Sequence, residues 1–223
     1  MLSKERLAKH ATWYSNVGIG GERLHVTYTT MIEANFSKLF LRESIFDNCF
    51  LMLSDFNHAV LEDAILTNNK FVCANFANSN LEHANLCYSD LRQANLQNAS
   101  LWKAFLENVN LQNANISYSF LRSASLNHSN LEGACVMETD MQTASLVGCN
   151  LRNACFYETN FYASILVNAD FRGSDLSNVN FDYANLSFAN LSDCNLEGAS
   201  FDNSIIEKTI FPKGFKIQNG FPA

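Results

Sequence analysis

The chain has 223 residues, 48% of them hydrophobic, and a formal net charge of −7 at pH 7. This length and composition support a single domain with an ample core, and the acidic balance argues against nonspecific binding to nucleic acid or to an anionic membrane surface. The excess of acid is local, because residues 131–211 carry eleven Asp and Glu residues against three Lys and Arg residues.

Residues 1–30 are expected to form a helical cap and a lead-in. Their charged start, without an apolar run, differs from a signal peptide. Ser3 can cap a helix, and the stretch from Lys4 to Tyr14 contains neither Gly nor Pro. A frayed, charged terminus is the alternative. The residues that would share one helical face are Leu7, His10, Ala11 and Tyr14.

From residue 31 to residue 211 the sequence repeats every five residues. Every position from Phe36 to Phe211 whose number ends in 1 or 6 is Leu, Phe, Ile, Val or Met, which gives 36 positions without an exception. A small residue stands two places earlier in 34 of these 36 units, and Leu39 and Asn69 are the exceptions. This unbroken register predicts one continuous repeat domain.

A period of five fits neither a helix nor a plain strand, whose side chains repeat every 3.6 and about every 2 residues. It fits a short extended step that is followed by a corner. Within the step, positions two apart point the same way. The small residue and the large apolar residue, such as Leu106, therefore point inward. The residue between them points outward and is most often Asn or Asp, which support turns.

Units such as Ala94-Asn95-Leu96 resemble the pentapeptide-repeat proteins, whose motif reads A(D/N)LXX. The resemblance covers residues 31–211. It implies an all-β fold, a right-handed quadrilateral β-helix with twenty residues in each coil, and thirty-six units then give about nine coils. A period of twenty also aligns two rows of Phe along neighbouring faces, namely Phe36, Phe56 and Phe76, and Phe161, Phe181 and Phe201.

Residues 212–223 leave the repeat and form a C-terminal tail. Its Pro and Gly residues argue against a helix. Its apolar residues are Phe215, Ile217 and Phe221. They are expected to fold over the last coil as a cap. The alternative is that they pack against another molecule, which would give a homodimer through the C-terminal end.

No group of residues has the pattern of a catalytic or metal site, and we predict no enzyme activity, metal or cofactor. His58, His83 and His128 fall at corners of different faces, so they cannot converge on one ion. The seven cysteines lack C-x-x-C spacing and indicate reduced thiols in the cytoplasm. Cys135 and Cys155 would stack one coil apart; they are interpreted as separate surface thiols, with a redox pair or metal clip as the alternative. No stretch approaches the roughly 18 apolar residues of a membrane span.

The acidic C-terminal half supplies the candidate binding residues. Like charges stacked one strand apart cost stability, so their presence favours a basic partner, with simple solubility as the alternative. Tyr157 and Tyr162 are added as exposed aromatic residues that could contact a partner, the alternative being ordinary scattered aromatics. The acidic candidates are Glu138 and Glu158 on one edge, Asp182 and Asp202 on the next face, and Glu197 nearby.

We expect a non-enzymatic binding or scaffold protein whose partner is another protein, with no direct contact to nucleic acid. The resemblance implies an alternative, because some members of the family, the quinolone-resistance and self-protection proteins, imitate duplex DNA and occupy the DNA groove of type II topoisomerases. DNA gyrase or topoisomerase IV would then be the partner. This chain departs from those members in two ways, since no loop interrupts its 36 units and its tail lacks the C-terminal helix of the mycobacterial type.

Overall fold

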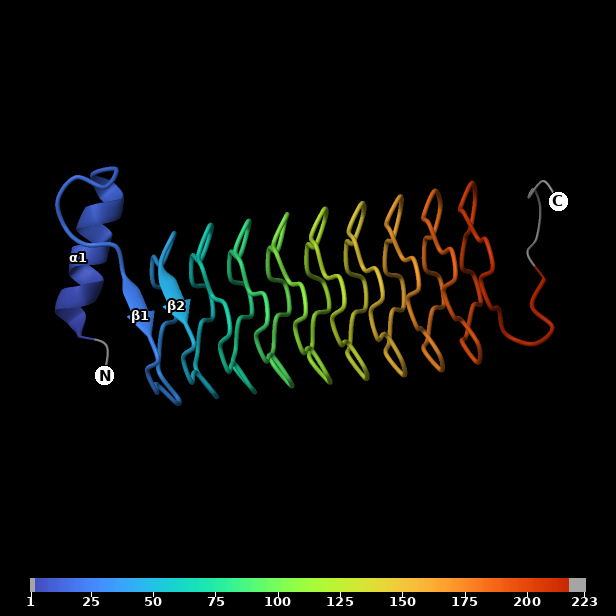
Figure 1. Ribbon diagram of the computed structural model, residues 1–223, viewed down its shortest axis with the longest axis horizontal. Coiled ribbons are helices and arrows are strands. Elements are labelled where there is room, and N and C mark those ends of the chain that lie inside the picture. The colour runs from blue at the N-terminus through green and yellow to red at the C-terminus, as the bar shows by residue number, and fades with distance from the viewer. Residues whose placement is uncertain (1–2, 217–223) are drawn as a thin grey trace.

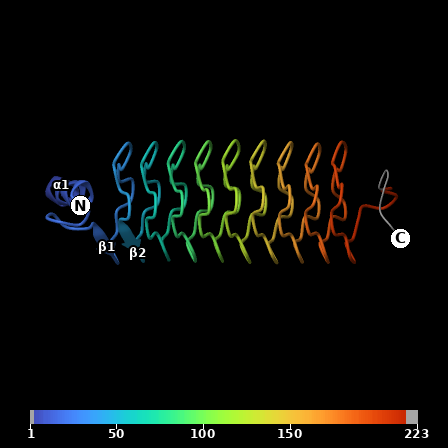
Figure 2. The ribbon, with the colours of Figure 1, turned by 90° about the horizontal axis from the view of Figure 1, so that it is seen from above.

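The computed structural model describes residues 3–216, which form a rod of stacked coils with a helix at its N-terminal end (Figure 1). The helix α1 (Lys4–Ser15) precedes two short strands, β1 (His25–Thr27) and β2 (Ile45–Asp47), which pair in parallel. The coils beyond them are joined by single-residue parallel bridges, and each bridge connects residues 20 positions apart. The predicted twenty-residue coil of a right-handed β-helix is confirmed, and a second view shows the same stacking along one axis (Figure 2).

Most corners are tight turns closed by a backbone hydrogen bond from the first residue of the next unit. The backbone N–H of Ala94 donates to the carbonyl oxygen of Leu91 at 3.0 Å. The second corner residue, Gln93, has a φ of 58°, and a positive φ at this place is the mark of a type II turn. The outward residue supports the next corner, because the side-chain oxygen of Asn95 accepts the N–H of Gln97 at 3.1 Å. The abundance of Asn in the middle of the units follows from this bond.

The two inward positions of the units fill the interior of the rod. Leu106 and Ala104 are each no more than 1% exposed. The two rows of Phe predicted from the period of twenty are present. Their ring centroids lie 4.6 and 4.7 Å apart along Phe36, Phe56 and Phe76, and 5.5 and 5.2 Å apart along Phe161, Phe181 and Phe201. Every coil therefore contributes to one continuous apolar core.

Asn69 breaks the small-residue rule because its side chain replaces the bond of a turn. It is fully buried, and its Nδ2 donates to the carbonyl oxygen of Phe46 while its Oδ1 accepts the N–H of Cys49, both at 2.7 Å. These are the two groups that bond to each other in a closed turn. The hydroxyl of Ser89 does the same one coil later, donating to Leu66 at 2.8 Å and accepting from the N–H of Asn69 at 3.0 Å.

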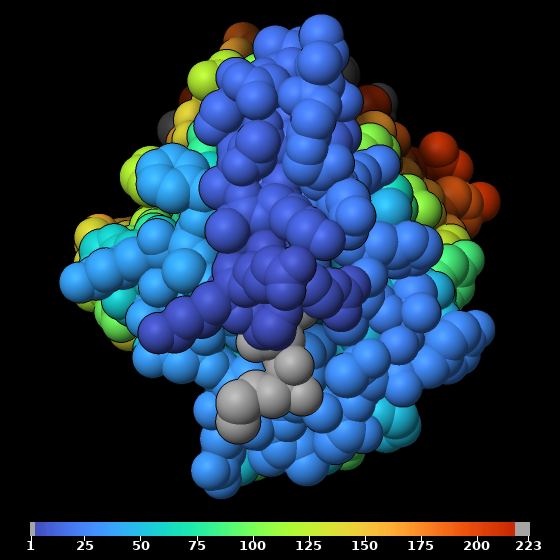
Figure 3. Space-filling model, turned by 90° about the vertical axis from the view of Figure 1, so that its left-hand side faces the viewer, coloured from blue at the N-terminus to red at the C-terminus, as the bar shows by residue number. Residues whose placement is uncertain are grey.

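Helix α1 lies across the N-terminal end of the coils (Figure 3). Ser3 caps the helix by accepting the N–H of Arg6 at 3.3 Å. His10 is 1% exposed, and its Nδ1 accepts the N–H of Leu24 at 3.1 Å. The short N-terminal helix predicted from the sequence is confirmed, and it covers the unpaired edge that a stacked sheet would otherwise expose.

The buried face of α1 is narrower than its helical pattern predicted. Only His10 is fully buried; Leu7 is half-buried, and Ala11 and Tyr14 are exposed. Leu7 shares a cavity of about 670 Å³ with Leu39 and other residues at the start of the first coil. The second exception to the small-residue rule, Leu39, thus lies at the end of the rod, where a larger side chain packs beside the cap instead of between two coils.

At the other end of the rod, Phe215 packs over the last coil. Its ring lies 6.0 Å from that of Phe201 and 5.4 Å from that of Phe211, measured between centroids. These contacts support the interpretation of the tail as a self-cap. The other two apolar residues of the tail, Ile217 and Phe221, lie outside the described residues.

Acidification is expected to loosen the N-terminal cap. Burial lowers the pKa of His10, and the charge of Arg23 acts in the same direction, whereas the backbone of Arg42 and the charge of Glu43 oppose it. The folded cap therefore disfavours protonated His10, and the unfolded segment takes up a proton more readily once the pH falls below about 6.5. The stability of the cap is thus unaffected above that pH and declines below it.

Amide hydrogen exchange at Leu24, which donates to His10, measures this effect. After correction for the intrinsic exchange rate, protection should fall between about pH 7 and pH 5, by at most about tenfold per pH unit. A His10→Gln variant keeps a neutral side chain and should show no such fall. Constant protection in the unmodified protein would contradict the assignment of His10 as the titrating group.

Candidate functional site

The acidic residues singled out in the sequence lie around one side of the C-terminal half of the rod. That side is the face whose inner surface is formed by Phe161, Phe181 and Phe201. We call the following nine residues the acidic face: Glu138, Tyr157, Glu158 and Glu197 on one edge, Asp140 on the face itself, and Tyr162, Asp182, Tyr183 and Asp202 on the other edge.

The acidic face includes two residues that the sequence analysis did not select. Asp140 lies on the face between the two edges, in the column of Phe120 and Asn160, and Tyr183 follows Asp182 at the same corner. Their register in the sequence was sufficient to find them. Tyr157 and Tyr162, selected as a pair, lie on opposite edges. Tyr162 instead contacts Tyr183, with ring centroids 5.2 Å apart and both rings exposed.

The three basic residues of this half of the chain lie on the opposite side of the rod. Arg152 and Arg172 both bond to Asp170, at 2.6 and 2.7 Å, and Lys208 lies 3.6 Å from Glu207. By contrast, the acidic face has six carboxylates, and none of them forms an ion pair within residues 3–216. Six of the eleven acids of residues 131–211 therefore lie on one side without a base, and the other five share the rest of the rod with the three bases.

The carboxylates of the acidic face differ in their exposure and in whether they bond to the backbone. The side chain of Asp182 is half-buried, and its Oδ1 accepts the N–H of Asp202 at 2.8 Å, which holds the corner of the next coil. Glu138, Glu197 and Asp202 are exposed and have no such backbone role in the described part of the chain. Asp182 thus has a structural function, and the other three are the better candidates for contact with a partner.

Glu158 and Tyr157 interact at one edge of the acidic face. A hydrogen bond to Glu158 and the charge of that carboxylate raise the pKa of Tyr157 above its ordinary value, and Glu138 adds to the effect. An amphipathic ring beside exposed carboxylates is the combination that protein interfaces favour.

The described residues contain no group of three His, Cys, Asp or Glu side chains that could hold a metal ion. Cys135 and Cys155 are partners in a parallel bridge, as their spacing predicted, and both are free thiols. Cys135 lies 3.1 Å from the hydroxyl of Ser117. In residues 3–216 there is also no helix with the length and apolarity to cross a membrane.

The sequence model described as "Pentapeptide repeats" matches this chain with eight copies, over residues 54–82, 74–113, 106–142, 144–182 and 180–212. These matches cover most of the coils. The chain belongs to the pentapeptide-repeat family. No curated protein matches it.

Three solved structures of pentapeptide-repeat proteins are similar to this one. HetL, which is involved in heterocyst differentiation regulation in the cyanobacterium Nostoc, is 26% identical, covers 92% of this chain and 96% of its own, and has a TM-score of 0.40. QnrB1, a plasmid-mediated fluoroquinolone resistance protein, is 17% identical over 81% of this chain and 92% of its own, with a TM-score of 0.45. A protein of the Arabidopsis thaliana thylakoid lumen is 21% identical over 48% and 61%, with a TM-score of 0.33.

Proposed function

We propose that this pentapeptide-repeat protein is a non-enzymatic binding protein that holds a basic partner protein on its acidic face. One observation carries the proposal: the six carboxylates of the face have no ion pair in the described chain, while the three bases of the same half are bonded on the opposite side. Solubility alone would be served by any distribution of charge. Concentration on one side adds repulsion between neighbouring coils, which a cationic partner would relieve.

The acidic face combines the two features that a partner surface needs. Its exposed carboxylates steer a cationic protein toward it over distances of about 8–10 Å at physiological salt. Its tyrosines then offer apolar contact area, since Tyr162 and Tyr183 form an exposed pair on one edge. We place this binding in the cytoplasm, a location that the seven free thiols support.

Neutralising the exposed acids should weaken binding to the partner. In the variant Glu138→Gln, Glu158→Gln, Asp202→Asn, we expect a loss of affinity of about 3- to 150-fold at low salt, because each of three exposed pairs contributes about 0.2–1 kcal/mol. Asp182 is left in place because it bonds to backbone. The partner would be captured with the unmodified protein, identified, purified, and its affinity for both forms measured by calorimetry.

The matched control removes the same charge elsewhere. Glu33→Gln, Asp193→Asn, Glu207→Gln changes three exposed carboxylates that lie outside the acidic face. It should bind the partner nearly as well as the unmodified protein does. Equal affinities for all three forms would refute the acidic face as the binding site.

A second candidate function is imitation of DNA on a type II topoisomerase. The spacing of charge favours it: six carboxylates occupy four stacked layers, about 14 Å of rod at roughly 4.8 Å per layer. This is about one charge per 3 Å, close to the roughly 3.4 Å between phosphates along one DNA strand. The duplex itself, with two strands, has about twice that density.

The same two variants test the second candidate. The purified protein would be added to DNA gyrase at micromolar concentration, with and without a fluoroquinolone, and supercoiling and drug-induced cleavage would be measured. DNA imitation requires a change that the acidic-face variant loses and the control variant keeps. If neither reaction responds to the unmodified protein, gyrase is excluded as the partner.

A further inference from the structure

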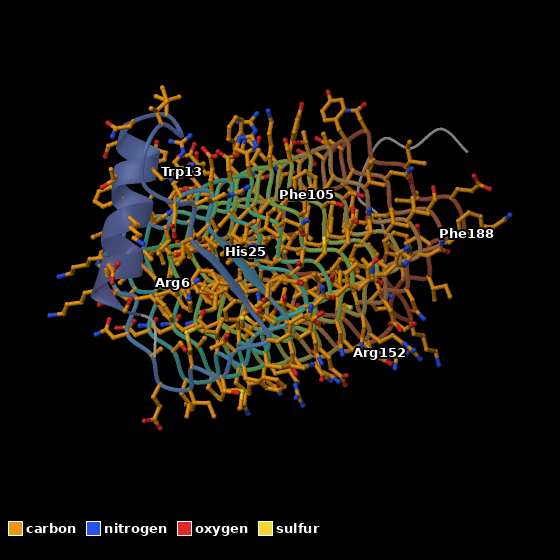
Figure 4. All side chains as sticks on the ribbon, turned by 60° about the vertical axis from the view of Figure 1, so that its left-hand side comes forward. Arg6, Trp13, His25, Phe105, Arg152 and Phe188 are labelled. Atoms are coloured by element: carbon orange, nitrogen blue, oxygen red, sulfur yellow. The ribbon has the colours of Figure 1, made fainter. Side chains whose placement is uncertain are left out.

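A small cavity lies between the helical cap and the first strand, at the far end of the rod from the acidic face. Its volume is about 200 Å³, and Arg6, Glu22, Arg23, Leu24 and His25 line it. Arg6 belongs to α1 and His25 to β1, so the cavity is formed by neighbouring elements (Figure 4). Three of its five residues carry guanidinium or imidazole groups, in a chain whose net charge is −7.

The two arginines are held in place by the backbone. Nη2 of Arg6 donates to the carbonyl oxygen of His25 at 2.5 Å, and Nε of Arg23 donates to the carbonyl oxygen of Glu43. The guanidinium of Arg23 also lies 5.9 Å from the centre of the Trp13 ring. Each arginine uses one of its five N–H donors for this bond, and a carbonyl carries no net charge. Most donors and the full positive charge of each arginine therefore remain available for a ligand.

Neither arginine of the cavity has a counter-ion in the described chain, although the lining includes Glu22 and the charge of His25 acts on the nearby carboxylate of Asp47. The single carboxylate of the lining, on Glu22, lies 3.6 Å from the ammonium group of Lys9, outside the lining. Neither Arg6 nor Arg23 has an ion pair in the stretch from Ser3 to Lys216. An anion in the cavity would therefore meet two charged guanidinium groups that no carboxylate neutralises, and it would gain charge-assisted hydrogen bonds from them.

We propose that this cavity binds a phosphate group through Arg6, Arg23 and His25. The site presents donors from α1, from the lead-in and from β1, which matches a tetrahedral dianion with several oxygens better than a planar carboxylate with two. Guanidinium groups, unlike ammonium groups, bond to two phosphate oxygens at once. The phosphate is either a free ion or the terminal group of a larger molecule. This site shares no residue with the acidic face, so the two proposals stand or fall separately.

Calorimetric titration of the full chain with inorganic phosphate at low ionic strength tests the proposal. We expect one site, and about tenfold weaker binding in both Arg6→Gln and Arg23→Gln, since each removes charge-assisted bonds. His25→Asn should weaken binding several-fold without affecting folding, because the side chain of His25 is exposed. Lys4→Gln changes the same charge on the same helix, at an exposed residue outside the cavity lining, and it should bind as the unmodified protein does.

Two further ligands identify what the cavity accepts. Acetate should bind at least about tenfold more weakly than phosphate, since it offers one pair of oxygens. O-phosphoserine that binds more tightly than inorganic phosphate would indicate the terminal phosphate of a larger molecule, and equal affinities would indicate the free ion.

Three results would overturn the proposal: no binding at about 10 mM phosphate, which detects even millimolar affinity, equal losses in Lys4→Gln and the cavity variants, or acetate that binds as well as phosphate. Thermal melting of each variant without phosphate separates a folding defect from a lost contact, and His25→Asn decides the case if the arginine variants melt early.

Discussion

Replacing Leu106 by Asp will prevent the chain from forming a soluble rod. Leu106 is 1% exposed and points into the core from the middle of the stack. Removing a buried leucine side chain costs about 2–5 kcal/mol, and an unpaired carboxylate in an apolar interior costs several kcal/mol more unless it takes up a proton. The sum approaches the roughly 5–15 kcal/mol by which a folded domain is stable.

Soluble expression and thermal melting measure this effect. The matched control is Phe105→Asp, which introduces the same carboxylate one residue earlier, at an outward position that is 48% exposed. We expect that variant to be soluble and to melt within a few degrees of the unmodified protein, since surface substitutions usually change stability by less than about 0.5 kcal/mol. A Leu106→Asp protein that melts like the unmodified one would contradict the inward position of Leu106.

Asn69→Leu should be the most damaging substitution of a buried polar residue in the coils. Leucine has the same number and branching of side-chain heavy atoms as asparagine but cannot bond, so the carbonyl of Phe46 and the N–H of Cys49 both lose their partner. A buried backbone group without a partner costs about 1–3 kcal/mol. We therefore expect a loss of about 2–6 kcal/mol in the free energy of unfolding, measured by denaturation in urea.

Asn69→Ser is the control that separates the loss of the hydrogen bonds from the change in side-chain size. Ser129 shows that a hydroxyl can close such a turn, because it donates to the carbonyl of Leu106 at 2.5 Å and accepts the N–H of Val109 at 3.0 Å. Asn69→Ser should therefore lose less than half as much stability as Asn69→Leu. Equal losses would mean that the volume of Asn69 matters and its bonds do not.

The sequence was sufficient to predict the direction of side chains in the coils, because a five-residue period leaves only one arrangement that buries every large apolar residue. It was not sufficient to explain Asn69. The period says that residue 69 points inward, but its partners Phe46 and Cys49 lie 23 and 20 residues away, and only the stacked coils bring them together. Likewise, helical spacing placed Tyr14 on one face with His10 but could not show how little of that face the end of the rod covers.

The sequence predicted which residues of the candidate site stack on one another, but it did not predict which side chains form ion pairs. The period of twenty stacks Glu138 with Glu158, and the structure agrees. The same period stacks Arg152 on Glu132, yet Arg152 bonds to Asp170. A long side chain at a corner can reach several neighbours, and its choice depends on rotamers and local charge, which a repeat does not encode. The separation of free acids from paired bases therefore became visible only in the structure.

Each residue stacks on the residue twenty places before it, and this stacking limits how such a chain can change in length. Loss of twenty consecutive residues would remove one whole layer and leave every later residue above its former column. Loss of five would rotate the remainder of the rod by a quarter turn, so that carboxylates now on one side would continue on the next. A protein whose function depends on the charge pattern of one side can therefore gain or lose only whole coils of twenty residues during evolution.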